Sequence, residues 1–307
     1  MDQTQSPIAR AAAVLKGGGL AILPTETVYG LAADAANARA VAAVYAAKGR
    51  PSFNPLIAHV SDVAMARRIA RFDARAERLA ARFWPGPLTL VLPIADEAAV
   101  CDLARAGLDT VAVRAPAHPM AQALLGAFAG PLVAPSANRS GRPSPTTFAD
   151  AWEETGAAAG AGLDGGACAI GLESTVVALL DEPRLLRPGA VTRAQIEALI
   201  GPLAEADADA RRSPGRLARH YAPELPLRLN VTDPRADEAW LSFGRDGAEP
   251  FNLSREGDLA EAAANLFAYL RAADRSGAAG IAVAPIPDTG LGEAINDRLR
   301  RAAGYVG

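Results

Sequence analysis

Residues 20–31, LAILPTETVYGL, join a short apolar run to a polar segment, and this junction decides the fold of the chain. The run 20–23 ends at Pro24, which lacks a backbone N–H and so favours the end of a strand. Such a run predicts a central strand that is buried on both faces. Polar residues directly after a buried strand are where α/β proteins bind ligands. A helix N-cap formed by Thr25 or Thr27 explains these polar residues equally well.

The same alternation of apolar runs and helical periodicity continues through the first 200 residues. The predicted strands cover residues 20–23, 55–60, 88–93, 110–114, 132–134 and 175–180. The predicted helices cover residues 7–15, 38–47, 63–82, 119–128, 148–155 and 193–200. This order predicts an α/β or α+β domain in which several strands are buried on both faces.

A second, smaller domain follows a change in composition. Residues 201–226 are rich in proline, glycine and charge without a sustained apolar period, which predicts a linker. Beyond it, the predicted strands cover residues 227–231, 240–243 and 280–284, and the predicted helices cover 258–273 and 293–302. We therefore predict one domain over residues 1–200, a linker over 201–226 and a small α/β domain over 227–307.

The composition excludes several classes of protein. The 307 residues are 50% hydrophobic and 21% charged, which is too apolar for disorder. With 34 acidic against 31 basic residues, the chain is not a wholly basic nucleic-acid binder. Neither of its two lysines, Lys16 and Lys48, is followed by Ser or Thr, which excludes a Walker-type phosphate loop. Its two cysteines, Cys101 and Cys168, belong to no C-x-x-C, which excludes a cysteine-based zinc site.

The sequence carries no sign of export or membrane insertion. Its first residues lack a basic segment followed by an apolar one, and no stretch approaches the roughly 18 apolar residues of a membrane helix. Together with the low cysteine content, this predicts a protein of the reducing cytoplasm that has no membrane partner.

Two groups of cations lie next to predicted strands. In residues 48–56, KGRPSFNPL, Lys48 and Arg50 leave a helix and enter a loop. A point charge beside a planar guanidinium can bind a polyphosphate, but both cations could instead interact with the dipole of the helix C-terminus. Arg114 ends the predicted strand 110–114, where it either binds a carboxylate through two N–H groups or is a solvated strand end.

Three further polar segments adjoin predicted strands. The loop 135–146, PSANRSGRPSPT, has hydroxyls, an amide and arginines that could wrap an anion, although a plain surface loop has the same composition. The segments 171–177, GLESTVV, and 185–189, LLRPG, each place polar residues beside an apolar run. Each segment is weak by itself, but their order along the chain is specific.

That order resembles the motif order of the YrdC-like family. The matching segments are PTETVYGL at 24–31, KGRPSFNPL at 48–56, WPGPLTLVL at 84–92, LDTVAVRAPAHP at 108–119, APSANRSGRPSPT at 134–146, GLESTVV at 171–177 and LLRPG at 185–189. The segment 213–223, SPGRLARHYAP, followed by a small α/β domain, is similar to the two-domain form of the family. The resemblance implies a YrdC-like twisted mixed sheet flanked by helices with a concave cavity, plus a smaller C-terminal Rossmann-like α/β domain.

The resemblance also implies an activity, that of an L-threonylcarbamoyladenylate synthase. Such a nucleotidyltransferase makes threonylcarbamoyl-adenylate and pyrophosphate from L-threonine, bicarbonate and ATP. The product passes to the tRNA threonylcarbamoyl-transfer machinery, which modifies adenosine 37 of tRNAs that read codons beginning with A. The reaction depends on positioning and charge neutralisation, so the lack of a catalytic triad is no objection. Mg²⁺ is expected to accompany ATP through phosphate oxygens and water, without a dedicated protein ligand.

The resemblance assigns roles to residues of the matching motifs. Lys48 and Arg50 are predicted to be catalytic. The residues predicted to contact threonine are Thr25, His59, Arg114, Ala134 and Ser174. The residues predicted to contact ATP are Lys48, Ser52, Thr110, Ser136, Asn138, Ser144, Arg187 and Tyr221.

Two other functions fit part of the sequence. A non-catalytic RNA-binding YrdC-like module would use the loop arginines for weak RNA binding, but residues 1–200 hold 18 basic and 18 acidic residues without interleaved aromatics. A carbamoyltransferase of hydrogenase maturation needs cysteine-rich zinc segments, which two cysteines cannot supply. Threonine-dependent release of pyrophosphate from ATP separates the enzyme from the RNA-binding module.

Overall fold

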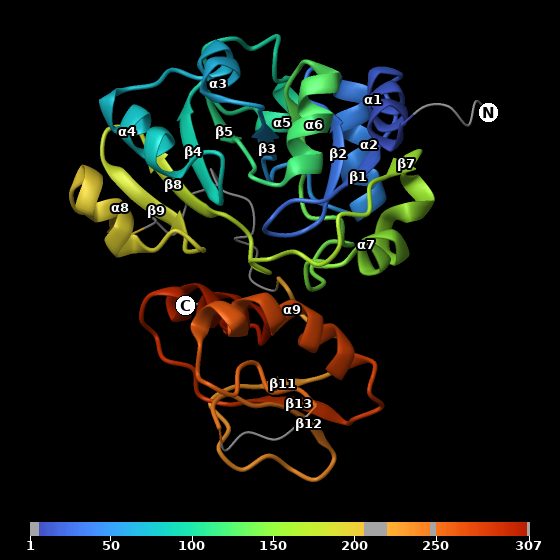
Figure 1. The fold of residues 1–307 in the computed structure, drawn as a ribbon, viewed down its shortest axis with the longest axis vertical. Helices are drawn as coiled ribbons and strands as arrows, with labels where there is room; N and C mark the ends of the chain where they lie inside the picture. The colour runs from blue at the N-terminus through green and yellow to red at the C-terminus, as the bar shows by residue number, and fades with distance from the viewer. Residues whose placement is uncertain (1–5, 206–219, 246–249, 306–307) are drawn as a thin grey trace.

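A mixed sheet organises the first part of the computed structural model, which describes residues 6–205, 220–245 and 250–305 (Figure 1). Within residues 6–205 the sheet has ten strands in the order β10-β9-β8-β4-β5-β3-β6-β2-β1-β7. These strands are β1 Ala21–Leu23, β2 Gly30–Asp34, β3 Ile57–His59, β4 Leu88–Pro93, β5 Thr110–Arg114, β6 Leu132–Val133, β7 Ala161–Gly162, β8 Thr175–Leu179, β9 Pro183–Arg187 and β10 Ala204–Glu205.

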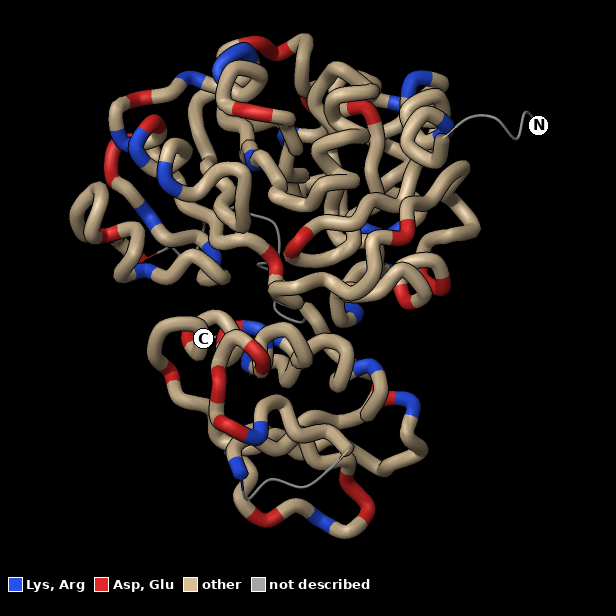
Figure 2. Tube along the Cα trace, in the orientation of Figure 1, with Lys and Arg blue, Asp and Glu red and all other residues tan. Residues whose placement is uncertain are grey.

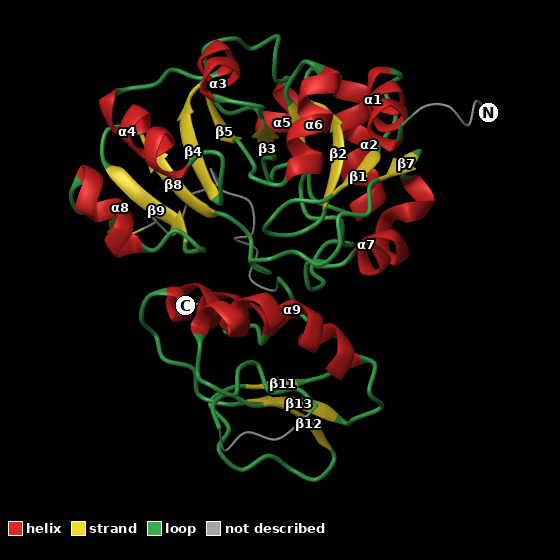
Figure 3. Ribbon diagram, viewed as in Figure 1, coloured by secondary structure: helices red, strands yellow, loops and turns green. Residues whose placement is uncertain are grey.

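Helices flank this sheet (Figure 3). They are α1 Pro7–Lys16, α2 Ala38–Lys48, α3 Val63–Ile69, α4 Ala74–Phe83, α5 Asp102–Arg105, α6 Pro119–Phe128, α7 Phe148–Thr155 and α8 Arg193–Ile200. The core between the helices and the sheet includes Ile22, Leu31, Val44, Leu79 and Val113, all fully buried. The predicted mixed sheet flanked by helices is confirmed.

The strand pairing brings predicted site residues to one edge of the sheet. Strands β3 and β5 are parallel, so His59 and Arg114 at their carboxyl ends are cross-strand partners. Strand β4 is antiparallel to β5, and β8 is parallel to β4 with Thr175 opposite Leu88. Ser174, which precedes Thr175, therefore lies at the same edge as Arg114.

Strands β1 and β2 pair antiparallel across the loop 24–29. The Thr25 hydroxyl donates to the carbonyl of Val28 at 2.6 Å and accepts from the Val28 amide at 3.2 Å, which closes the loop into a turn. The alternative of a helix N-cap at Thr25 or Thr27 is therefore wrong. The sequence does not predict β2, because its glycine and alanines have low strand propensity.

Other differences come from short elements and one helix break. The predicted helix 63–82 is two helices, because Asp73 accepts from the amides of Arg75 and Ala76 and so starts α4. Helix α5 and the strands β7 and β10 have two to four residues, too few to show a period. Strand β9, which the sequence also does not predict, pairs with β8. Strand β10 lies within the predicted linker and pairs with β9.

The second domain has its own sheet and core. Its strands, parallel in the order β11-β13-β12, are β11 Leu227–Arg228, β12 Glu238–Leu241 and β13 Gly280–Val283. Its helices are α9 Leu259–Asp274 and α10 Leu291–Ala302, and both lie on the side of the small sheet that faces the first domain (Figure 1). Leu241, Leu266, Phe267 and Ile281 form the centre of this core. This arrangement agrees with the predicted small α/β domain.

Residues 206–219 of the predicted linker lie outside the described residues, and the domain boundaries at 200 and 227 stay a prediction. Acidic and basic positions are interspersed over both domains (Figure 2). No helix in the described part of the chain is long and apolar enough to span a membrane.

Candidate active site

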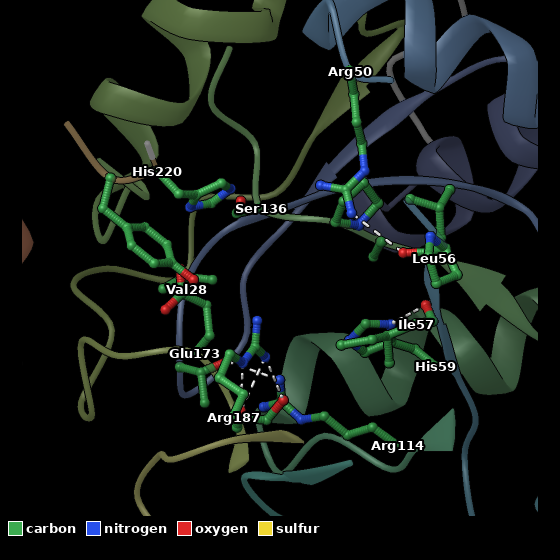
Figure 4. A pocket seen from close by; sticks show the side chains of 16 residues that line it. Val28, Arg50, Leu56, Ile57, His59, Arg114, Ser136, Glu173, Arg187 and His220 are labelled. Atoms are coloured by element: carbon green, nitrogen blue, oxygen red, sulfur yellow. Dashed lines mark hydrogen bonds between the residues drawn. The ribbon is translucent and has the colours of Figure 1, made fainter. Parts of the chain in front are cut away.

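A cavity of about 50 Å³ lies at the sheet edge where β3, β5 and β8 place their polar residues. Its lining residues are Thr27, Val28, Arg50, Pro55, Leu56, Ile57, His59, Arg114, Ala134, Pro135, Ser136, Glu173, Ser174, Arg187, His220 and Tyr221. In Figure 4, Arg50 points into this space from one side, and Arg187 and Arg114 lie on another. The fold thus gathers most of the predicted site residues around one cavity.

Two buried guanidinium groups give the cavity a positive charge. Arg50 donates to the carbonyls of Asn54 and Pro55 at 3.3 and 3.2 Å, and Arg187 donates to the carbonyl of Ser174 at 2.9 Å. Burial lowers the pKa of Arg50 to about 10 and also lowers the pKa of Arg187 below its ordinary value. A guanidinium group nevertheless stays protonated in proteins. No carboxylate in the described parts of the chain forms an ion pair with either group. Buried cations of this kind attract an anionic ligand.

Arg114 is held in a fixed orientation at the cavity wall. Its Nη2 donates to Oε1 of Glu26 at 2.6 Å, its Nη1 to Oγ1 of Thr27 at 2.9 Å, and its Nε to the carbonyl of Gly86 at 3.2 Å. Burial by itself would raise the pKa of Glu26, but the charge and hydrogen bond of Arg114 lower that pKa below its usual value. A guanidinium has five N–H donors, so Arg114 retains donors for a substrate carboxylate.

His59 is a neutral side chain at neutral pH. It is buried at the end of β3, and burial together with the charge of Arg114 lowers its pKa to about 3. Its Nδ1 lies 3.2 Å from the carbonyl oxygen of Ile57, which fixes the ring. A neutral imidazole in this position can hydrogen-bond an amino or hydroxyl group of a ligand next to Arg114.

Lys48 is buried but is not among the lining residues. Its ammonium group donates to the backbone carbonyls of Ser136 and Asn138. Burial and the charge of Arg50 lower the pKa of Lys48 well below its ordinary value. Lys48 therefore holds the loop that carries Ser136, whereas the sequence predicts that its charge faces the phosphates directly.

Three other predicted residues lie away from the cavity. Thr110 is at the opposite end of β5 from Arg114 and lines a different groove, together with Asp73 and Asp181. Ser52 is exposed on its loop, and Thr25 is bonded within its own turn. For Thr110 this is a correction: the sequence predicts a nucleotide contact, but the direction of the strand carries it away from the other residues.

Asn138 and Ser144 support the cavity from behind its surface. Asn138 Nδ2 donates to the carbonyls of Arg139 and Arg142 at 2.7 and 2.9 Å, while its buried Oδ1 has no partner. The Ser144 hydroxyl is buried and donates to Oε1 of Glu173. Both residues therefore shape the loops of the site in this conformation.

Three polar residues that line the cavity, Thr27, Glu173 and His220, are not among the predicted site residues. Each lies within a quoted motif, one or two positions from a predicted residue, so position in the motif was the available signal. Burial by itself would raise the pKa of Glu173, but the charges of Arg298 and Arg187 lower it. The net result is a pKa below the usual value. Glu173 is therefore an ionised group among the cavity's cations.

His220 and Tyr221, which belong to the described part of the predicted linker, line the cavity. The Tyr221 ring lies 5.3 Å from that of Phe267 on α9, and the His220 ring lies 4.0 Å from the Tyr221 ring. A ligand pocket typically has a volume of about 300–1,000 Å³. The cavity, at about 50 Å³ with both rings in its lining, is smaller than this range.

The described residues contain no group of three or more His, Cys, Asp or Glu side chains that could hold a metal ion. The polar side chains that line the cavity are mainly arginines, histidines and hydroxyl groups, which suit an anionic ligand that brings its own counter-ion. The fold and cavity define a two-domain α/β protein with a cationic, anion-binding site at one sheet edge, of the YrdC-like class.

Comparison with known proteins identifies the family. A family model described as "Telomere recombination" matches residues 13–189, and one described as "Threonylcarbamoyl-AMP synthase, C-terminal domain" matches residues 191–304. The chain is 39% identical to the threonylcarbamoyl-AMP synthase of Bacillus subtilis, with 97% of this chain and 93% of the relative covered. It is 41% identical to that of Pyrococcus abyssi, with 96% and 93% covered. The chain belongs to the threonylcarbamoyl-AMP synthase family.

A solved structure shares both domains. The crystal structure of P. abyssi Sua5 complexed with L-threonine superposes with a TM-score of 0.88 at 39% identity, covering 97% of this chain and 94% of that one. The agreement extends over the second domain, so the arrangement described above is common to both proteins.

Proposed function

We propose that this protein forms threonylcarbamoyl-adenylate and pyrophosphate from L-threonine, bicarbonate and ATP, and is thus a nucleotidyltransferase. The observation that carries the proposal is the pair of buried cations Arg50 and Arg187 in the same cavity as Arg114 and His59. Arg50 and Arg187 suit a polyphosphate, whereas Arg114 and His59 suit an amino acid. Family membership and the relatives' name support the same reaction.

The residues of the cavity divide the work of such a reaction. The free N–H groups of Arg114 bind the threonine carboxylate, and His59 and Ser174 hydrogen-bond its amino and hydroxyl groups. The threonine amine and bicarbonate combine to a carbamate with loss of water. An oxygen of the carbamate group then attacks the α-phosphorus of ATP, and the bond from that phosphorus to the leaving pyrophosphate oxygen breaks. Arg50 and Arg187 neutralise charge on the phosphates, so positioning and electrostatics supply the catalysis without a covalent nucleophile.

The nucleotide substrate is proposed to be MgATP, in which the ion is held by phosphate oxygens and water. The product would serve a tRNA threonylcarbamoyl-transfer system in the cytoplasm. Direct RNA binding by this chain is the competing function, and the balance of charge in residues 1–200 favours the enzyme.

The test is the release of pyrophosphate from ATP, measured with threonine, bicarbonate and Mg²⁺ present and with each omitted in turn. We expect release only in the complete mixture, and a product with the mass of threonylcarbamoyl-adenylate. Absence of pyrophosphate together with tight binding of tRNA would refute the enzyme and support the RNA-binding module.

A further inference from the structure

Arg298 on α10 of the second domain is fully buried against the first domain. Its Nε donates to Oε2 of Glu173 at 2.9 Å, and its Nη1 donates to the carbonyl of Pro188 at 2.9 Å. Glu173 lines the cavity, and Pro188 directly follows Arg187, which also lines it. One side chain of the second domain thus fixes two segments of the proposed nucleotide site.

Arg298 also supports the aromatic ring inside the cavity. Its guanidinium carbon lies 5.5 Å from the centre of the Tyr221 ring, a distance typical of a cation–π contact. Tyr221 also contacts Phe267 of α9, with the two ring centres 5.3 Å apart. The second domain therefore sets the position of Tyr221 as well as that of Glu173.

A second buried arginine makes a similar contact on the other side of the site. Arg271 on α9 donates from Nη1 to Oε1 of Glu154 at 3.0 Å, and from Nη2 to the carbonyl of Pro143. Pro143 directly precedes Ser144, whose hydroxyl donates to Glu173. Arg271 therefore holds the residue next to Ser144, and Ser144 and Arg298 both donate to the carboxylate of Glu173.

The rim of the interface provides a contrast. Arg275, the C-cap residue of α9, forms ion pairs with Asp150 at 3.3 Å and Glu153 at 2.6 Å on α7, and its side chain is 49% exposed. These partners belong to a surface helix and not to a loop of the cavity. Exposed ion pairs contribute little free energy, whereas the loss of one partner of a buried pair leaves an unpaired charge.

We propose that Arg298 is a positioning residue of the nucleotide site, so that the second domain completes this site and is not merely attached to it. The inference rests on the proposed function. Arg298 aligns Glu173 and the Arg187–Pro188 backbone and backs Tyr221, with Arg271 securing the loop that carries Ser144. The residues proposed to bind threonine are Arg114, His59 and Ser174, and Arg298 donates a hydrogen bond to none of them in the structure.

The experiment compares Arg298→Met, Arg298→Lys and the rim control Arg275→Met in the full chain. Pyrophosphate release gives the KM for ATP, and calorimetry gives the Kd for threonine. We expect Arg298→Met to raise the KM for ATP by about 10-fold to 100-fold, because a small misplacement of binding groups has effects of that size. The Kd for threonine should stay within about twofold, and Arg275→Met should leave both constants within about twofold. Arg298→Lys should lie between Arg298→Met and the wild type, since it keeps the charge but loses the planar fork.

The double variant Arg298→Met/Glu173→Gln removes the unpaired carboxylate charge that Arg298→Met leaves at Glu173. Circular dichroism verifies the folding of each variant. A folded Arg298→Met or Arg298→Lys protein with the wild-type KM for ATP overturns the inference. An equal effect of Arg275→Met also overturns it, because general loosening of the interface would then be the cause. Wild-type protein without threonine-dependent pyrophosphate release refutes the proposed function, which is a separate outcome.

Discussion

Arg114 and Glu26 form a buried ion pair, with Nη2 and Oε1 2.6 Å apart and side chains only 4% and 12% exposed. A protein carboxylate therefore occupies one edge of the guanidinium to which we assign the substrate carboxylate. Arg114 lines the cavity, and its hydrogen bonds to Glu26 and Thr27 hold the guanidinium in place. The pair thus orients the cation and leaves the threonine carboxylate the donors that Glu26 does not use.

Arg114→Lys should weaken threonine binding and spare ATP. A lysine keeps the charge but loses the fork, and a hydrogen bond to a charged group contributes about 1.5–3 kcal/mol. Pyrophosphate release at varied threonine should show a KM raised by about 10-fold to 100-fold. An unchanged KM for threonine in the folded variant would contradict the assignment of Arg114.

Lys48→Ala should weaken ATP use through the loop that Lys48 holds. The carbonyls of Ser136 and Asn138 would lose a charged donor, which contributes about 1.5–3 kcal/mol. The matched control is Lys16→Ala, because Lys16 donates to the carbonyl of Ala127 far from the cavity, at 2.9 Å. Normal ATP kinetics in a folded Lys48→Ala protein would refute a role for this lysine at the site.

Thr110→Val should leave the kinetic constants unchanged, whereas Thr27→Val should raise the KM for threonine. Thr110 lines the separate groove, so its replacement should change neither KM by more than about twofold. The Thr27 hydroxyl accepts a hydrogen bond from Arg114. Loss of this hydroxyl should weaken threonine binding by about 1.5–3 kcal/mol, which a raised KM for threonine would report. A larger effect of Thr110→Val on ATP kinetics would favour the sequence-based assignment over the placement seen here.

Tyr221→Ala should speed the loss of bound nucleotide if the linker end closes over the site. Tyr221 lines the cavity and contacts both Phe267 and Arg298, so a lid would hold this ring against the bound nucleotide. Such loops commonly gate binding and release. Stopped-flow dissociation of a fluorescent ATP analogue measures the rate, and an unchanged rate would count against a lid.

The stability of the protein should fall as the pH drops below 6.5, partly through His59. The folded pKa of His59 is about 3 and its ordinary value is 6.5, so the unfolded chain binds the extra proton between these pH values. Stability from the neutral ring is complete above pH 6.5 and is lost as the pH falls towards 3. Between pH 7.5 and 5, His59→Gln should lose about 2 kcal/mol less than the wild type in denaturant unfolding. Equal losses in the two proteins would show that His59 does not titrate in this way.

The sequence predicts the strand ends and with them the threonine side of the site. Buried apolar runs mark β3 and β5, and His59 and Arg114 end these strands, so their shared edge follows from the parallel pairing. The loops are less predictable, because the direction of a loop side chain depends on segments far away. Thr27 rather than Thr25 lines the cavity because Thr25 bonds to Val28 within the turn.

By itself, then, the sequence determined the α/β class, the motif order and the arginine-based anion site, because apolar periodicity and residue type are local properties. The tertiary structure alone decided which motif residues meet. Thr110 and Arg114 share one strand, yet at about 3.3 Å per residue they stand roughly 13 Å apart and serve different surfaces. Arg298 carries no local signal at all, since only the packing of α10 against the first domain places it on Glu173.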